Sequence, residues 1–379
     1  MARPLDTDTL CAHAGPPREP VVRVPHSHVT PLYQNSVFDF GSIDDSLPAL
    51  SGDGYVYARL GLPNTDELGQ AVAALEGADA GFATSSGMGA IASAVLSVCS
   101  AGDRVLVQSD AYGGSHALLS QDLARLGIEV VVQHVYETTE LSTALPGAKA
   151  MLVESVANPL LHEPEIPALY AACKQHGVTL IVDNTFATPL RKRVLRGGGQ
   201  VVVHSVTKFL GGHHDLCAGV VVGDGEVVAA ARGVAARFGL MAAPFDAWLA
   251  VRGMRTLAVR MERAWTTSAA LHGRVGGHPA VKRVFSAERC ALFSFDVGDQ
   301  QAANRVVAGF ELITLSPSLG GVTTTVSHPA SSSHKAMSPA QRAAAGISDG
   351  LLRISVGLES VDDLWADLER GLSAARPGS

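Results

Sequence analysis

From about residue 64 onward, two patterns of hydrophobic positions alternate along the chain. Short β-branched runs, apolar at nearly every position, are separated by segments whose apolar residues recur at helical spacing, such as Leu118 to Leu126 and Ile166 to Cys173. Strands that are apolar on both sides belong to a sheet covered on both faces, so the pattern predicts an α/β fold with a mostly parallel sheet. The expected strands are Arg104 to Val107, Val130 to Val132, Met151 to Val153, Val178 to Val182, Val201 to Val203 and Val220 to Val222.

The two ends of the chain differ from this middle part. Residues 1–60 are rich in Pro, Gly, His and Ser and show little period, which predicts an arm rather than a domain. The first helix should begin at Asn64, with Glu67 completing a capping box, and end at Gly77. We therefore expect a large domain over residues 61–240.

After Gly239 the pattern mixes strands and helices in the manner of a separate α+β domain, expected over residues 241–379. Pro244 to Ala270 reads as one long helix. The later elements are expected at Ala291 to Val297, Gln300 to Phe310, Leu351 to Ser355 and Val361 to Ala374.

Composition narrows the class of protein. The chain has 379 residues, of which 47% are hydrophobic and 17% charged, as in a compact globular enzyme. Its net charge is −7 and its longest basic run is Arg191 to Arg193, which argues against nucleic acid as a partner. The first residues lack the apolar core of a signal peptide and no stretch is long enough to span a bilayer, so we expect a cytoplasmic protein. The five scattered cysteines indicate neither a disulfide framework nor a metal site.

Chemistry is expected where the parallel strands end, because ligands of open α/β sheets bind outside the carboxyl ends of the strands. One strand ends at Asp183, whose buried carboxylate would pair well with a protonated pyridine nitrogen. The next leads to Lys208, which alone among the six lysines follows a sheet strand and suits Schiff-base chemistry. By themselves, Asp183 could equally cap a turn and Lys208 could be a solvated lysine.

Two further motifs lie near these ends. Ser85-Ser86-Gly87-Met88 opens a helix whose first amides favour a phosphate. Tyr112-Gly113-Gly114 follows another strand, and its ring could lie on a flat heterocycle while the phenol transfers a proton, or it could simply cover the core. Together with Asp183 and Lys208 these motifs predict a cofactor site.

At this point the sequence resembles the Cys/Met-metabolism family of pyridoxal-phosphate enzymes. The resemblance rests on Tyr57-Ala58-Arg59, Ser85 to Met88, Tyr112 to Gly114, Glu154 to Pro159, Val182 to Phe186, Ser205 to Lys208, Ser318 to Gly321 and Arg353 to Glu359. It implies the type I fold of pyridoxal-phosphate transferases, with a seven-stranded, mostly parallel sheet in the large domain and a smaller C-terminal α+β domain.

The resemblance also implies a role for each site residue. Lys208 should carry the cofactor and act as the base, and Tyr112 should face the ring and donate a proton to the leaving sulfur. Asp183 should hold the pyridine nitrogen. The phosphate should be bound by Ser86, Gly87, Met88, Ser205 and Thr207, together with Tyr57 and Arg59 from the arm of a neighbouring subunit. The substrate carboxylate should be held by Arg353, Ser318 and Asn158. The expected assembly is a homotetramer of dimers that share active sites.

The substrate follows from three positions where family members that act on cystathionine are expected to carry charges. Here these are Val56, Ala117 and Pro317, none of which can pair with a charged tail. We therefore expect α,γ-elimination of L-methionine, or a similar S-alkyl homocysteine, to 2-oxobutanoate, ammonia and a thiol, as in methionine γ-lyases. Gly114, however, stands where those enzymes usually carry a cysteine.

The alternative within the family is cystathionine γ-lyase or cystathionine γ-synthase activity. Two alternatives lie outside it. A binding protein without catalysis is disfavoured by Lys208, Tyr112 and Arg353, and a nicotinamide-binding fold by the absence of Gly-x-Gly-x-x-Gly from the phosphate turn.

Overall fold

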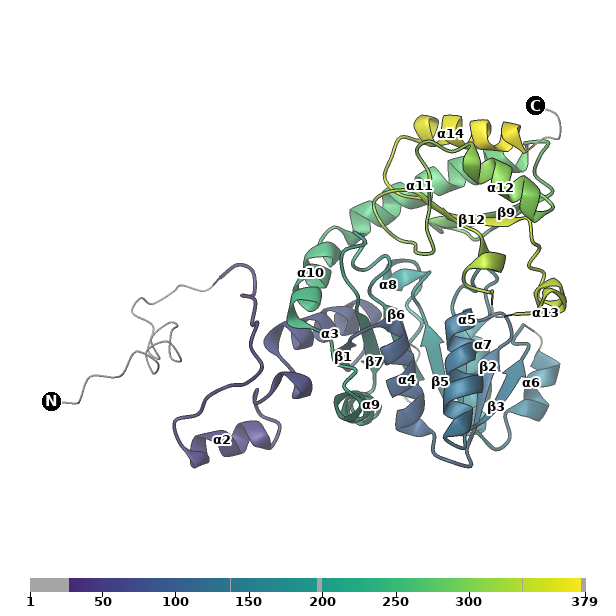
Figure 1. The fold of residues 1–379 in the computed structure, drawn as a ribbon. Coiled ribbons are helices and arrows are strands. Elements are labelled where there is room, and N and C mark those ends of the chain that lie inside the picture. The colour runs from purple at the N-terminus through teal and green to yellow at the C-terminus, as the bar shows by residue number, and fades with distance from the viewer. Residues whose placement is uncertain (1–26, 137, 196–199, 336, 376–379) are drawn as a thin grey trace.

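A computed structural model describes residues 27–136, 138–195, 200–335 and 337–375. It contains a seven-stranded sheet and a five-stranded sheet, stacked one above the other with helices around both (Figure 1). The described arm projects to one side. Among the helices of the described residues, none is long and apolar enough to cross a membrane.

The seven-stranded sheet has the order β1-β7-β6-β5-β4-β2-β3. The five strands from β6 to β3 run parallel, whereas β7 is antiparallel to both β6 and β1. The predicted α/β class and the mostly parallel sheet are therefore confirmed. Its strands are β1 (Ala80–Thr84), β2 (Arg104–Gln108), β3 (Glu129–Gln133), β4 (Ala148–Glu154), β5 (Thr179–Asp183), β6 (Gln200–Ser205) and β7 (Gly219–Gly223).

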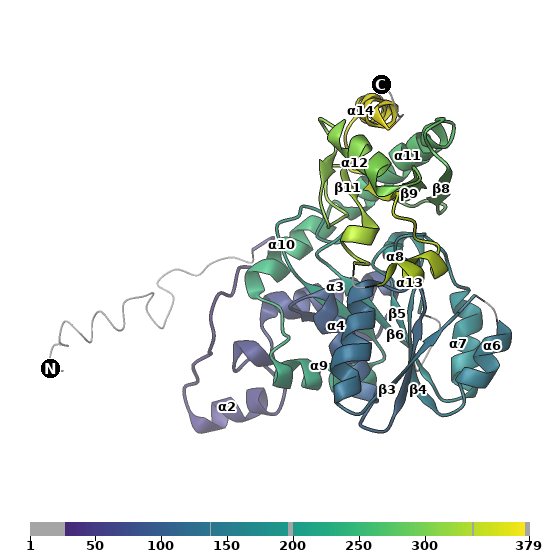
Figure 2. The same cartoon turned by 45° about the vertical axis from the view of Figure 1, so that its right-hand side comes forward.

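Alternate residues of each central strand enter two different cores. In β5, Leu180 and Val182 belong to one hydrophobic cluster and Ile181 to the other. This explains why the strands are apolar at every position, since each face of the sheet is covered (Figure 2). One face packs against α3 (Pro63–Glu76), α7 (Ile166–Gln175) and α10 (Pro244–Met254), and the other against α4 (Gly87–Val98) and α9 (Gly225–Phe238).

The first helix of the large domain begins earlier than the sequence pattern predicted. Pro63 occupies the first turn of α3, and the cap is formed by Leu62, whose backbone N–H donates to Thr65 Oγ1 at 3.0 Å. Asn64 is buried inside the helix, where its side chain binds the arm at Tyr33 N and Pro31 O. The expected capping box of Asn64 and Glu67 is wrong because proline fits the first helical position and needs no N–H partner there.

The predicted long helix from Pro244 to Ala270 is two helices, α10 and α11 (Leu257–Gly276). At the break, the Gly253 carbonyl accepts hydrogen bonds from side chains. Its donors are Thr256 Oγ1 at 3.1 Å and Arg260 Nη2 at 2.9 Å. The same guanidinium binds the carbonyls of Phe209 and Leu210 at 2.8 and 3.3 Å. Arg260 thus joins the helix break to the turn that follows β6.

The second sheet has the order β10-β11-β12-β9-β8 and lies under α11 and α14 (Val361–Ala374). Its strands are β8 (Arg283–Ser286), β9 (Leu292–Asp296), β10 (Thr314–Leu315), β11 (Thr325–Ser327) and β12 (Leu351–Ser355), with α12 (Gln300–Ala308) beside them. The predicted smaller α+β part is present. The exact domain boundaries at residues 60 and 240 stay predictions.

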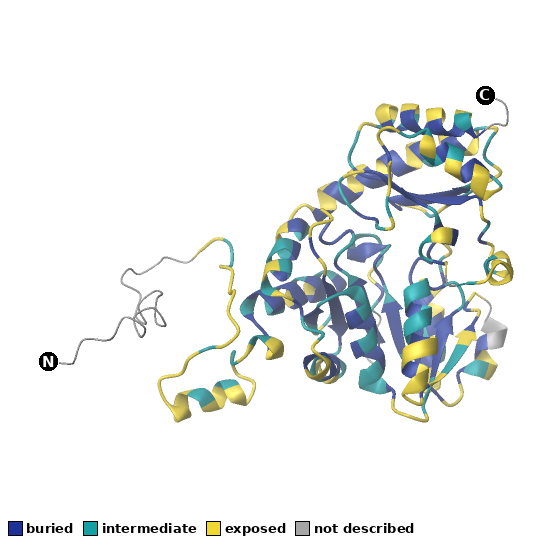
Figure 3. Cartoon of the chain, in the orientation of Figure 1, coloured by how far each residue is buried: buried dark blue, intermediate teal, exposed yellow. Residues whose placement is uncertain are grey.

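The remaining elements are short or lie outside the core. They are α2 (Ile43–Leu50), η1 (Ala58–Leu60), α5 (Gly113–Ala117), the π-helical turn η2 (Leu118–Leu123), α6 (Thr138–Ala144), α8 (Thr188–Arg191), η3 (Pro329–Ser331) and α13 (Pro339–Ala344). None of the residues of α2 is buried, which agrees with an arm rather than a domain (Figure 3). Among the described cysteines, Cys99, Cys173 and Cys290 are buried free thiols and Cys217 is exposed.

Candidate active site

The carboxyl ends of β2, β4, β5 and β6 meet at one edge of the large sheet, below the second sheet (Figure 1). Glu154, at the end of β4, pairs in register with Asp183, at the end of β5. Asp183 in turn pairs with Val203 of β6, five residues before Lys208. Parallel pairing therefore brings the predicted acid and the predicted lysine to the same edge.

Lys208 lies in a tight turn after β6. Its backbone N–H donates to Ser205 O at 3.1 Å, and Gly212 N donates to Lys208 O at 2.8 Å. The side-chain Nζ donates to Ser318 Oγ at 3.2 Å, which joins this turn to the C-terminal part of the chain. Burial lowers the pKa of the Lys208 ammonium and the charge of Arg353 lowers it further. A lysine in this setting gives up its proton more readily than an exposed one.

The loop that carries Ser318 can approach Lys208 only because Gly320 follows it. Gly320 has φ of +83°, and a Cβ on it would lie 2.7 Å from Phe209 N and 2.9 Å from the Lys208 carbonyl carbon. Any side chain here would push the loop away from the lysine. This close approach explains why glycine stands at position 320 of the motif Ser318 to Gly321.

Asp183 is held by the residue two positions after it. Its Oδ1 accepts from Thr185 N at 3.0 Å and from Thr185 Oγ1 at 2.5 Å, and within the described part of the chain no hydrogen bond reaches Oδ2. Burial raises the pKa of this carboxyl, while Thr185 and His204 lower it. The carboxylate is therefore oriented and short of positive charge, as a site for a cationic ring nitrogen requires.

A buried network beside Asp183 was missed by the sequence reasoning. Glu76 Oε1 accepts from Asn184 Nδ2 at 2.7 Å and lies 2.7 Å from His204 Nε2, and all three side chains are buried. The signal was present, since His204 and Asn184 are polar residues directly beside a strand end. Glu76 carried no such signal, because it is the last residue of α3 and lies far from Asn184 and His204 in the sequence.

The predicted phosphate turn lies against the lysine turn. Ser86 caps α4, its Oγ accepting from Gly89 N at 3.1 Å, which leaves the amides of Gly87 and Met88 at the helix N-terminus. A Cβ on Gly87 would lie 2.7 Å from Ser205 Cβ, so α4 touches the end of β6 here. Thr207 Oγ1 is already engaged with the backbone of Ala218. The structure thus groups Ser86, Gly87, Met88 and Ser205 as expected.

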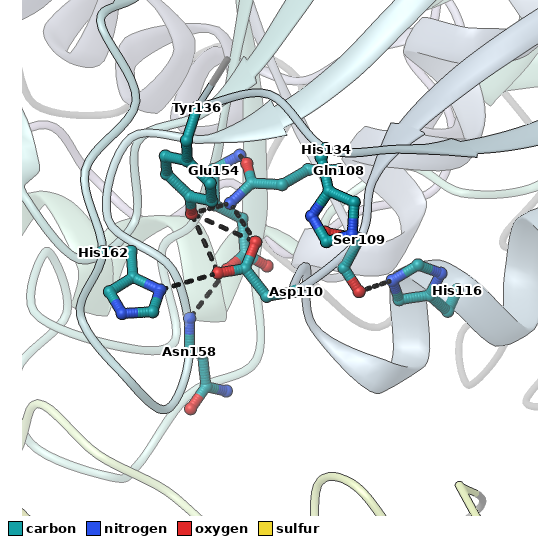
Figure 4. A network of polar contacts seen from close by, with 9 residues as sticks. All are labelled: Gln108, Ser109, Asp110, His116, His134, Tyr136, Glu154, Asn158 and His162. Atoms are coloured by element: carbon teal, nitrogen blue, oxygen red, sulfur yellow. Dashed lines mark hydrogen bonds and ion pairs between the residues drawn. The ribbon is translucent and has the colours of Figure 1, made fainter. Parts of the chain in front are cut away.

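Tyr112 lies directly before α5, and its backbone contacts Glu154, a member of the polar network drawn in Figure 4. Its ring folds over Gly114, where an added Cβ would meet Tyr112 Cε1 at 2.4 Å. The ring is 39% exposed, so it remains accessible to a flat ligand at the sheet edge. The backbone N–H of Tyr112 donates to Glu154 Oε1 at 2.6 Å.

Arg353, in β12 of the second sheet, contacts Asn158, in the loop after β4. Arg353 Nη1 donates to Asn158 Oδ1 at 2.5 Å, and the guanidinium lies 5.9 Å from the ring centre of Phe186. Burial lowers the pKa of Arg353 to about 10, and its Nε has no hydrogen-bond partner among the described residues. A buried guanidinium with a free donor suits a carboxylate ligand. His334, also buried and electrostatically coupled to Arg353, was not predicted; burial lowers its pKa to about 4.

Two predicted phosphate ligands lie elsewhere in the single chain. Arg59 Nη1 donates to Ala236 O at 3.1 Å, at the end of α9, and its guanidinium lies over the ring of Tyr57. Tyr57 is 40% exposed. The expected contribution of these residues to the site of another subunit stays a prediction.

The remaining residues fit pyridoxal phosphate. A helix N-terminus suits its dianion, and Asp183, whose carboxylate has few cationic partners, suits its ring nitrogen. The half-buried Lys208 suits its aldehyde carbon. Arg353 with its unpaired Nε is left for the carboxylate of an amino acid.

The fold and this site define a type I pyridoxal-phosphate enzyme, and comparison with known proteins agrees. Residues 8–373 match the family described as Cys/Met metabolism PLP-dependent enzyme, and the chain belongs to this family. It is 38% identical to L-methionine gamma-lyase of Porphyromonas gingivalis over 91% of this chain and 92% of that protein.

Solved structures of related enzymes superpose on this chain over most of its length. A cystathionine gamma synthase from Xanthomonas oryzae pv. oryzae, 37% identical, superposes with a TM-score of 0.86 over 92% of this chain and 93% of its own. An O-acetylhomoserine (thiol)-lyase of Campylobacter jejuni, 28% identical, has a TM-score of 0.87 over 92% of this chain and 96% of its own, and contains N'-pyridoxyl-lysine-5'-monophosphate. The protein is thus a pyridoxal-phosphate enzyme of a family of lyases and synthases that act on sulfur amino acids.

Asp183→Asn should weaken cofactor binding without destabilising the apoprotein. Burial raises the folded pKa of Asp183, so its charge costs the apoprotein stability as the pH rises above the unfolded value of about 3.9. At pH 7 the apo variant should therefore melt no lower than the wild type. The affinity for pyridoxal phosphate should fall about tenfold to hundredfold, since a bond between charged groups is lost.

Thermal melts with and without pyridoxal phosphate provide the test, with the exposed Asp122→Asn as control. A variant that gains as much melting temperature from the cofactor as the wild type would contradict the role of Asp183.

Proposed function

We propose that the protein is a pyridoxal-phosphate lyase that catalyses α,γ-elimination of L-methionine or a similar S-alkyl homocysteine. With one water, the products are 2-oxobutanoate, ammonia and a thiol. The proposal concerns substrate and reaction, within a family whose members differ in both.

The observation that carries the proposal is the sign of the charge around Lys208. Besides burial, its pKa is lowered by Arg353 and raised by one neighbour, the thiol of Cys217; no carboxylate of the described residues is among the groups that shift it, whereas Glu154 raises the pKa of Arg353. This surplus of positive charge suits the α-carboxylate of a substrate. It leaves no acid of this chain beside the lysine to pair with the second ammonium of cystathionine, and an unpaired buried charge is costly.

The three positions where cystathionine enzymes are expected to carry charges also favour an apolar substrate. Val56 and Ala117 are partly buried, and Pro317 is exposed directly before Ser318. An apolar S-alkyl group needs no charged partner at any of them, whereas a polar tail does.

The roles proposed for the residues of the chain follow from their contacts. Arg353 and Asn158 hold the substrate carboxylate, and Ser318 orients Lys208 Nζ. Pyridoxal phosphate, when bound, supplies an electron sink for a carbanion at the substrate Cα. Lys208, whose pKa is lowered, takes the proton from Cα, would deliver it to the bound cofactor, and, as a neutral amine again, takes one from Cβ. Tyr112 OH donates a proton to the departing sulfur.

Cystathionine γ-synthase or γ-lyase activity is the second candidate. The likeness to the solved cystathionine gamma synthase favours it, because that enzyme and the methionine gamma-lyase are about equally identical to this chain.

We also propose that the arm completes the site of a second copy in a homotetramer of dimers. The described part of the arm exposes many large apolar side chains, a surface that monomers rarely leave open. They are Leu32, Tyr33, Val37, Phe40, Ile43, Leu47, Leu50, Tyr57 and Leu60. A subunit that covers this surface would also contact Tyr57, which belongs to it, and lie close to the neighbouring Arg59.

The substrate proposal predicts that methionine is used with a higher kcat/KM than cystathionine. One missing charge pair corresponds to about 1–3 kcal/mol, or roughly a tenfold to hundredfold preference. Pro317→Glu should shift the preference toward cystathionine, and the exposed Pro279→Glu, which adds the same charge elsewhere, should not. Release of 2-oxobutanoate measures both rates. A wild type that prefers cystathionine tenfold or more would overturn the proposal in favour of the second candidate.

The arm proposal predicts complementation between two inactive variants. Arg59→Ala spoils the site of the neighbour, and Lys208→Ala spoils the site of its own chain. Mixed oligomers would therefore contain some sites with both residues intact and regain part of the activity. Subunit exchange, followed by mass spectrometry of differently tagged chains, is the control. Demonstrated exchange without any recovered activity would refute shared sites.

A further inference from the structure

A single buried carboxylate connects the two loops that flank the sheet edge. Glu154, 7% exposed at the end of β4, accepts from Tyr112 N through Oε1 at 2.6 Å. Its Oε2 accepts from Asn158 N at 3.1 Å (Figure 4). Each oxygen has its own backbone donor. The side chain thus fixes the main chain of both loops at once.

The two loops carry different parts of the proposed chemistry. Tyr112 belongs to the loop after β2, and Asn158 to the loop after β4, where its Oδ1 accepts from Arg353 Nη1 at 2.5 Å. A shift of either backbone amide would move the phenol relative to the guanidinium. The distance between these two groups sets how a substrate held by its carboxylate meets the proton donor.

The carboxylate is retained at an electrostatic cost. Burial raises the pKa of Glu154 well above its ordinary value, and Asp183 on the next strand raises it further, whereas the amides of Tyr112 and Asn158 lower it. Asp110 lies nearby and also raises it. A hydrophobic side chain would avoid this cost but would leave two buried N–H groups without acceptors.

Further hydrogen bonds hold the backbone of Glu154 in place. Its N–H donates to Gln108 Oε1 at 2.8 Å, and Gln108 Nε2 donates to Asp110 Oδ1 and Tyr136 OH, both at 2.8 Å. Tyr136 OH donates to Asp110 Oδ2 at 2.9 Å, and His162 approaches the same oxygen at 3.2 Å. Figure 4 shows Gln108, Tyr136 and His162 converging on Asp110, close to Glu154. The network fixes which end of Gln108 faces Glu154.

We propose that Glu154 is a positioning residue that sets Tyr112 against the Asn158–Arg353 pair, and so determines substrate-carboxylate binding and proton donation together. This inference rests on the roles proposed above for Tyr112, Asn158 and Arg353, but not on the identity of the thioether.

Glu154→Gln tests it with little change of shape. Glutamine has one acceptor oxygen, so its amide NH₂ must face one of the two backbone N–H groups. Amide exchange in the holoenzyme, followed by mass spectrometry, should therefore speed up in the peptide that contains Tyr112 or in the one that contains Asn158. With whichever of methionine and cystathionine the wild type consumes, kcat should fall and KM should rise, each by about tenfold, since the buried bond is made to a charged group. Glu129→Gln, the same change at an exposed position of β3, is the matched control and should alter none of these.

Gln108→Leu serves as a second variant if Glu154→Gln does not fold. It removes the acceptor of the Glu154 backbone N–H and leaves the Glu154 carboxylate in place. It should change kcat and KM in the same direction by a smaller factor. Unchanged amide exchange in both peptides would overturn the inference, and so would faster exchange with unaltered kcat and KM. A wild type that consumes cystathionine and not methionine would refute the proposed substrate and leave this test in force.

Discussion

The parallel pairing of β5 with β4 and β6 is the constraint on which the rest of the structure depends. It places Glu154, Asp183 and the turn of Lys208 at one edge, although these residues are separated by tens of positions along the chain. Because both faces of the sheet are buried, a one-residue slip in any of these strands would exchange the side chains that enter the two cores and would shift the residues at its carboxyl end along the edge. The register that protects the core therefore also fixes the chemistry.

Charge is distributed unevenly around this edge. Carboxyl groups cluster along β4 and β5, where burial raises the pKa of both Glu154 and Asp183, while Lys208 and Arg353 face them with lowered pKa values. Each of these groups is strained by the burial of its charge, and Glu154 and Lys208 are strained further by a neighbour of like charge. A ligand with a cationic ring, a phosphate and a carboxylate relieves all of these strains together, which is why one cofactor and one amino acid suit the site better than either alone.

The sequence predicted what depends on local pattern. The central strands were visible because they are apolar throughout, and Asp183 and Lys208 were visible because they follow such strands. The edge strand β1 escaped notice, since Ala80 and Gly81 resemble a turn. The break between α10 and α11 depends on Arg260 reaching Gly253 and the lysine turn, a tertiary contact with no local signal. Glu76 and Glu154 acquire their roles only through partners brought close by the fold, and the arm only through contacts with another chain.

The central claim, that the sheet edge holds pyridoxal phosphate on Lys208, is tested most directly by reductive trapping. Borohydride reduction of the holoenzyme fixes the cofactor to the lysine that carries it, and tryptic peptides then locate it by mass spectrometry. The account predicts the pyridoxyl group on the peptide that contains Lys208, and no labelled peptide from the Lys208→Ala variant. Stoichiometric label on any other of the six lysines of the wild type would contradict it.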